Sequence, residues 1–222
     1  MPTLYLVRHG QASFGADDYD QLSDLGQRQC VQLGRYFADR GLVFDAALCG
    51  TLKRHQQTLD GICEGSGARL EATTWPGLNE YDSHAVISAI HPEPLALPTT
   101  PELYRHHFRL LRQGLLQWML GRSQPVGLPS WADFRQGAVG ALRHVQDSGA
   151  QNILLVSSGG PIACAVGHVL ATPPEATVEL NMRLRNTSVT EFVVTPKYLA
   201  LQTYNTLPHL NSVEFDSWIT HA

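Results

Sequence analysis

Several features that mark common classes of protein are missing from this chain of 222 residues. No block of lysines or arginines occurs, and the formal net charge is −4, so we expect no nucleic acid partner. No apolar run approaches the roughly 20 residues that cross a bilayer. The N-terminus also has no basic region followed by a signal-like apolar core. The sequence therefore predicts no membrane association and a cytoplasmic location.

Motifs for disulfides and metals are equally scarce. The cysteines show no CxxC or zinc-like spacing, so we expect reduced and mostly buried thiols without a disulfide framework. The ten histidines form no HxH or HExxH pattern. His106 and His107 are adjacent and would point away from each other on a helix. We accordingly expect neither a metal site nor a cofactor.

What the chain does have is enough apolar sequence for one well-packed domain. The composition is 43% hydrophobic and 16% charged, without internal repeats or low-complexity tracts. Within residues 84–129, Pro92, Pro94, Pro98 and Pro101 break the pattern, and an apolar-striped helix from about Glu102 to Leu120 follows them. We predict a single domain over residues 1–222, in which residues 84–129 form an inserted helical cap.

Strand-like apolar runs alternate with helical periodicities along the rest of the chain. Strands are predicted at about 4–7, 44–48, 69–74, 152–156, 187–194 and 198–204, and helices at about 24–40, 52–64, 131–145 and 161–170. This alternation predicts an α/β fold, a three-layer α/β/α sandwich with a mostly parallel central sheet. The two late strands are candidates for antiparallel pairing.

The first strand ends in Arg8-His9-Gly10 and is the centre of the functional prediction. The carboxyl edge of a buried strand is where such sheets deliver chemistry. Arginine offers a charged planar fork that suits phosphate, and a neutral imidazole has a ring nitrogen that can attack phosphorus. Successive side chains of a strand alternate between faces, so both residues reach one ligand only if the chain leaves the pleat. We expect Gly10 to permit that turn.

Two further positions fit the same chemistry, although each alone would be read as an ordinary exposed residue. Arg54 lies in the first turn of a predicted helix, where free N–H groups and the helix dipole favour an anion. Glu80 follows the third predicted strand, at an edge where a carboxyl group can transfer a proton. The run from Ser157 to Gly160 forms a second strand-to-helix edge with free N–H groups.

In this order and spacing, the chain resembles the histidine phosphatase superfamily, also called phosphoglycerate mutase-like, over nearly its whole length. The resemblance rests on several short motifs: Leu6-Val7-Arg8-His9-Gly10, Leu22-Ser23 with Gly26 and Gln29, Thr51-Leu52-Lys53-Arg54 with Thr58, Leu78-Asn79-Glu80, Ser157 with Gly159-Gly160, Asn186-Thr187-Ser188-Val189, and Asn205 with His209-Leu210.

The resemblance implies a role for each matching residue. His9 is expected to be the nucleophile that takes the phosphoryl group, and Glu80 the acid that protonates the leaving alcohol. Arg8 and Arg54 are expected to hold the phosphoryl oxygens, with Ser158 and Gly159 on the neighbouring edge. The substrate class implied is a small phosphorylated metabolite, and no metal is implied.

One position departs from the family pattern. The family has Ser-His-Gly-Gly where this chain has Ser157-Ser158-Gly159-Gly160, so the second histidine is missing. Losing such a donor costs about 10² to 10³ in rate, which predicts an attenuated enzyme. His84, His91 or His209 would have to enter the cleft to replace it, and each is more often an ordinary surface or packed histidine.

Two functions from different classes remain open at this point. One is a phosphomonoesterase acting through phospho-His9, which the presence of Glu80 favours. The other is a regulatory pseudoenzyme that binds a phosphate group, which Ser158 favours. A phosphoglycerate mutase is disfavoured because related mutases carry an asparagine where Gly15 lies. An α/β-hydrolase nucleophile at Ser158 is disfavoured because its turn requires a glycine at Val156.

The sequence leaves the oligomeric state open as well. Trp218 and the apolar residues near the C-terminus fit either a core or an interface, so a homodimer is compatible with the sequence.

Overall fold

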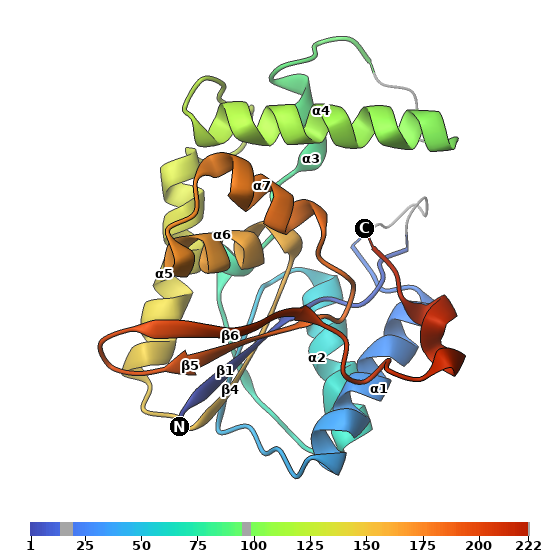
Figure 1. Cartoon of the computed structure of the whole chain (residues 1–222), viewed down its shortest axis with the longest axis vertical. Coiled ribbons are helices and arrows are strands. Elements are labelled where there is room, and N and C mark those ends of the chain that lie inside the picture. Colours follow the sequence, from blue (N-terminus) through green and yellow to red (C-terminus); the bar gives the residue numbers. More distant parts are fainter. Residues whose placement is uncertain (14–19, 95–98, 222) are drawn as a thin grey trace.

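A computed structural model describes residues 1–13, 20–94 and 99–221. Its described strands form a six-stranded sheet in the order β3-β2-β4-β1-β5-β6 (Figure 1). The pairs β1–β4, β2–β4 and β2–β3 are parallel, and β5 and β6 join as antiparallel strands, so the predicted topology is confirmed. The strands are β1 (Thr3–Arg8), β2 (Ala46–Cys49), β3 (Ala72–Thr74), β4 (Asn152–Ser157), β5 (Val189–Val194) and β6 (Leu199–Thr206).

Helices cover both faces of this sheet, which confirms the three-layer architecture. Leu4 and Leu6 of β1 pack in the cluster that holds α5 and α6, whereas Val7 packs with α1 and α2 on the other face. This alternation follows from the period of two residues in a strand. The helices are α1 (Asp24–Asp39), α2 (Lys53–Ser66), α3 (Ser83–Ser88), α4 (Pro101–Met119), α5 (Trp131–Asp147), α6 (Gly159–Leu170) and α7 (Pro174–Met182), with short 3-10 helices η1 (Pro76–Leu78) and η2 (Val213–Trp218).

The predicted elements differ from the observed ones in a few places. The third strand is only Ala72–Thr74, shorter than the predicted 69–74, and α7 was not predicted. The start of α1 agrees with the sequence, since the Ser23 hydroxyl caps it by accepting a hydrogen bond from the Gly26 N–H at 3.0 Å.

The segment from 84 to 129 contributes most of α3 and the whole of α4, which crosses above α3 and α7 in Figure 1. Its buried residues form an apolar cluster of their own with Tyr81 and Val178, in which Trp118 is buried. Its role as an inserted cap stays a prediction. Within the described residues, no helix combines the length and apolar character needed to cross a membrane.

The C-terminal residues pack onto α1. The Arg28 guanidinium lies 5.1 Å from the ring centroid of Trp218, and the buried Gln29 side chain donates to the Trp218 carbonyl at 2.6 Å. Trp218 therefore contacts its own chain, and a homodimer stays a prediction.

Candidate active site

His9 follows β1, near the centre of the sheet, and is held from both sides. Its N–H donates to the Ser157 carbonyl of the β4 edge at 2.9 Å, and its carbonyl accepts from the Thr187 N–H at 3.2 Å. The side chain is only 4% exposed. The sheet therefore fixes the backbone on which the imidazole is mounted.

Gly10 is required here for a different reason than expected. Its φ is not positive, so the conformational freedom of glycine is not what the position uses. Instead, a Cβ at Gly10 would lie 2.6 Å from the Gly26 carbonyl oxygen and 2.8 Å from Cys30 Sγ of α1. Glycine is needed at this position because α1 packs directly against it and leaves no room for a side chain.

The hydrogen bond made by His9 decides which ring nitrogen is nucleophilic. Nδ1 lies 2.7 Å from the Gly10 carbonyl oxygen, which can only accept, so Nδ1 carries the hydrogen and Nε2 has a free lone pair. Burial, followed by the nearby Arg8 and Arg54 guanidinium groups, holds the pKa of His9 well below its usual value. The imidazole is therefore neutral and able to attack an electrophile.

Arg8 and Arg54 bring two buried cations to this imidazole. Arg8 Nη1 donates to the Leu184 carbonyl at 2.5 Å, and Arg54 in the first turn of α2 pairs with Asp20 Oδ1 at 2.8 Å. Both guanidinium groups also lie near Glu80, where burial raises the pKa of the carboxyl group and their charges oppose that effect. The structure thus brings Arg8, His9, Arg54 and Glu80 together, as the sequence predicted. Gly15, the position of the asparagine in related mutases, lies outside the described residues.

Glu80 is held at the start of α6. The Gly160 N–H donates to both of its carboxylate oxygens, at 3.0 and 3.2 Å. Burial raises the pKa of Glu80, and this effect is opposed by Arg54, by the Gly160 N–H and by Arg8. A carboxyl group with a raised pKa keeps its proton at higher pH and can act as a general acid.

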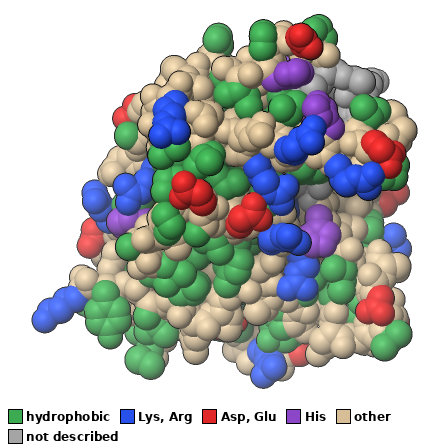
Figure 2. All heavy atoms as spheres, turned by 45° about the horizontal axis from the view of Figure 1, so that its top comes forward, with side chains coloured by type: hydrophobic (Ala, Val, Ile, Leu, Met, Phe, Trp, Pro, Cys, Tyr) green, Lys and Arg blue, Asp and Glu red, His purple; other side chains and the backbone are tan. Residues whose placement is uncertain are grey.

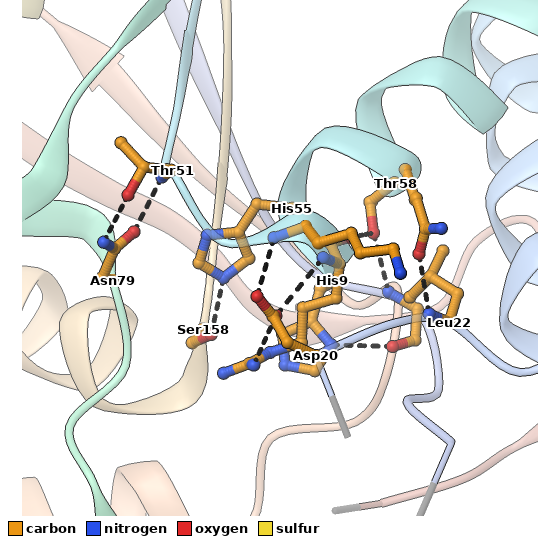
Figure 3. Close-up of polar contacts among 12 residues, drawn as sticks. His9, Asp20, Leu22, Thr51, His55, Thr58, Asn79 and Ser158 are labelled. Carbon is orange, nitrogen blue, oxygen red and sulfur yellow. Dashed lines mark hydrogen bonds and ion pairs between the residues drawn. The ribbon is translucent and has the colours of Figure 1, made fainter. Parts of the chain in front are cut away.

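Ser158 lies at the N-cap of α6 and is fully buried, but its side chain does not cap the helix. Its Oγ lies 2.7 Å from His55 Nε2, a contact drawn in Figure 3 with His9 beside it. Gly159, the next residue, has no room for a side chain, since a Cβ there would lie 2.5 Å from Asn181 Oδ1.

His55 is the site residue that the sequence reading missed. It is fully buried in the first turn of α2, directly after Arg54, and its ring centroid lies 5.7 Å from that of His9. Burial, together with Arg54, lowers the pKa of His55 to about 3. The sequence did offer one indication of His55: it directly follows Arg54 in the first turn of the same helix, and therefore lies at the same sheet edge.

The three histidines considered as replacements at position 158 have other surroundings. His84 is exposed on α3, and His91 packs edge-on against His106 with centroids 6.2 Å apart. His209 is buried, with Nε2 2.9 Å from Thr187 Oγ1. The histidine in contact with Ser158 is His55.

A cavity of about 670 Å³ lies beside His9. Tyr104 of α4 and the C-terminal residues Ile219 to His221 line it together with Arg8. Figure 2, with the upper side of Figure 1 turned forward, shows cationic side chains and histidines gathered in the centre and right of this face. Among the described residues, no group of three His, Cys, Asp or Glu side chains is placed to hold a metal ion. The cavity has space for a small anionic ligand.

The family model of the histidine phosphatase superfamily (branch 1) matches residues 4–207. The chain belongs to the histidine phosphatase superfamily. This membership confirms the resemblance seen in the sequence and places the chain among enzymes of the phosphohydrolase type, as expected.

Individual relatives are more distant. A curated 2,3-bisphosphoglycerate-dependent phosphoglycerate mutase from Allorhizobium ampelinum is 38% identical over 88 residues, which span 36% of this chain and 41% of that relative's length. Phosphoserine phosphatase from Entamoeba histolytica shares the fold with a TM-score of 0.67 and 19% identity, over 95% of this chain and 100% of that one. A putative alpha-ribazole-5'-P phosphatase from Escherichia coli gives 0.65 and 20%, over 93% and 98%.

Proposed function

We propose that the protein is a phosphomonoesterase that hydrolyses a small phosphorylated metabolite through a phosphohistidine on His9. The observation that carries this proposal is the hydrogen bond of His9 Nδ1 to the Gly10 carbonyl at 2.7 Å, which leaves Nε2 free beside two buried arginines. The cavity next to His9 supports a small substrate, because its volume of about 670 Å³ is in the range of small-molecule sites.

In the first step, the Nε2 lone pair attacks phosphorus and the bond from phosphorus to the ester oxygen breaks. Protonated Glu80 donates its proton to the departing oxygen, so the alcohol leaves neutral. Arg8 and Arg54 bind the phosphoryl oxygens, whose charge they stabilise more strongly in a buried site than in water.

In the second step, water attacks the phosphorus of phospho-His9. The Glu80 carboxylate accepts a proton from this water as the bond from phosphorus to Nε2 breaks. Inorganic phosphate leaves, and both His9 and Glu80 return to their starting protonation states. No cofactor or metal takes part in this sequence.

The proposal is tested with 4-nitrophenyl phosphate, without added metal, from about pH 5 to 8. We expect measurable turnover by the wild type and none by His9→Ala. Mass spectrometry of rapidly quenched enzyme should show a phosphoryl group on the peptide that carries His9. Thermal unfolding of both proteins provides the control for folding.

The outcome separates the enzyme from the pseudoenzyme. If the wild type is as inert as His9→Ala and yet binds inorganic phosphate, the phosphatase proposal fails and a phosphate-binding regulatory protein is the better description. A screen of phosphorylated metabolites is worthwhile only after the first outcome.

A further inference from the structure

His55 and Ser158 belong to helices that pack on opposite faces of the sheet, and their side chains meet in the interior of the protein. His55 lies in the first turn of α2, and Ser158 lies at the start of α6. Neither side chain is exposed, and 2.7 Å separates Nε2 from Oγ. The hydrogen bond therefore forms in a buried environment, where it is stronger than in water.

The sheet places this pair next to His9. Strands β1 and β4 are parallel, and their register pairs Arg8 with Ser157. His9 and Ser158 are thus the next residues on two adjacent strands, at the edge where both chains leave the pleat. The His55 ring also lies close to the His9 ring, at 5.7 Å between centroids.

The Ser158 hydroxyl does not cap the helix at whose start it lies. Serine is a favoured N-cap residue because its oxygen accepts from a free N–H of the first helical turn. Ser158 occupies the N-cap of α6 but makes no such bond, and its oxygen contacts His55. Its orientation is set by the imidazole.

Close packing holds the imidazole in place from the other side. A Cβ on Gly50 would lie 2.1 Å from His55 Nδ1 and 2.9 Å from Asn79 Oδ1. Asn79 is itself fixed by two hydrogen bonds to Thr51, as Figure 3 shows. The ring is thereby confined between the Gly50 backbone and Ser158.

We propose that His55 is a positioning residue of the phosphoryl site, whose Nε2–H directs the Ser158 hydroxyl so that its O–H donates to a phosphoryl oxygen bound at His9. Two tautomers of neutral His55 fit the contact, and an anion selects between them. If the hydroxyl donated to His55, its lone pairs would face the anion. If His55 donates, the hydroxyl hydrogen remains available to the anion. The inference rests on the proposed phosphatase function of the same site.

The test compares substitutions that move the hydrogen-bonding nitrogen. A glutamine amide reaches the position of His55 Nε2, whereas an asparagine amide reaches only that of Nδ1.

We expect His55→Ala and Ser158→Ala each to lower kcat for 4-nitrophenyl phosphate by about 10²-fold. The double variant should be no slower than either single variant, because the two residues act as one unit. His55→Gln should retain far more activity than His55→Asn. His168→Ala, at the exposed end of α6, is the matched control for loss of a histidine.

Vanadate binding to the same variants gives a readout that does not depend on turnover. We expect the affinity to follow the order wild type, His55→Gln, His55→Asn, and to fall in Ser158→Ala. The inference is overturned if folded His55→Gln and His55→Asn bind vanadate equally well, or if the effects of His55→Ala and Ser158→Ala multiply. An inert wild type without a phosphoenzyme would instead contradict the phosphatase proposal. If His55→Ala does not fold, the comparison of glutamine with asparagine decides.

Discussion

The N–H of Gly160 donates to both carboxylate oxygens of Glu80, at 3.0 and 3.2 Å. The same glycine leaves the space that the carboxylate occupies, since a Cβ at position 160 would lie 2.3 Å from Oε1. The Gly160 N–H and the Glu80 carboxylate come within hydrogen-bond distance only because residue 160 has no side chain. The acid of the proposed mechanism is positioned by the first turn of α6.

Gly160→Ala should therefore displace Glu80 without removing any catalytic group. We expect kcat for an alkyl phosphate to fall by about 10²-fold, because a displacement of about 1 Å at a reacting group has effects of this size. Steady-state kinetics combined with thermal unfolding check the prediction. A variant that remains folded and keeps wild-type kcat would show that Glu80 has no fixed position in the reaction.

Glu80→Gln should affect substrates according to their leaving group. Alkyl phosphates need a proton on the departing oxygen when His9 takes the phosphoryl group, so we expect a loss of about 10² to 10⁴ in kcat/KM for them, and a clearly smaller loss in kcat/KM for 4-nitrophenyl phosphate. Equal losses for both substrates would argue against Glu80 as the acid.

The pH dependence of turnover offers a second view of Glu80. Its pKa is raised, so the protonated acid should persist above the pH range of an ordinary glutamate. Activity on alkyl phosphates should fall as the pH rises through the pKa of Glu80, and this alkaline decline should vanish in Glu80→Gln. A decline that survives the substitution would have to come from another group.

Asp20→Asn should strengthen binding of inorganic phosphate. Asp20 Oδ1 pairs with Arg54 Nη1, and Oδ2 accepts from the Lys53 N–H at the start of α2. Asparagine keeps an acceptor for that N–H but removes the negative charge that competes with phosphate for Arg54. Because the pair is partly exposed, we expect at most about a fivefold decrease in the inhibition constant of phosphate. Asp24→Asn on α1 is the control, and weaker binding in Asp20→Asn would mean that Asp20 holds Arg54 in position.

His209 should make stability depend on pH. Burial lowers its pKa from 6.5 to about 3, so below about pH 6.5 the unfolded chain binds a proton that the folded protein does not. Its contribution to stability is thus complete above this pH and lost as the pH falls. We expect His209→Gln to reduce the slope of the free energy of unfolding by about 1.4 kcal/mol per pH unit between about pH 6 and 4. Urea unfolding at several pH values measures this slope, and unchanged slopes would contradict the prediction.

Periodicity was sufficient to predict the centre of the fold. The strands β1 and β4 are buried on both faces, so their sequences are continuous apolar runs that match no amphipathic helix. α7 was missed because it spans only nine residues and begins at the second of two adjacent prolines, Pro173 and Pro174. The predicted range of the third strand was too long because this strand lies at the sheet edge, where few contacts constrain its composition.

Of the candidate site, too, the sequence predicted one part and missed another. Arg8 and His9 lie at the end of a strand, Glu80 follows another strand, and Arg54 lies in the first turn of a helix, so the sequence alone indicated that they share one sheet edge. His55 also lies in the first turn of α2, but its role depends on a contact with Ser158, 103 residues further along the chain, which the sequence does not show. Gly10 was singled out for its conformational freedom, whereas the helix packed against it explains why glycine is needed. Both points require the distances between elements, which no local pattern contains.

The strand that leads to His9 lies between β4 and β5, away from both edges of the sheet. The amide hydrogens of a strand paired on both sides exchange with solvent only when most of the molecule opens, whereas edge strands exchange through local fraying. The edge strands β3 and β6 can therefore open while the imidazole keeps its orientation. In increasing urea, catalytic activity should accordingly persist through fraying of the edges and disappear together with the cooperative unfolding of the sheet.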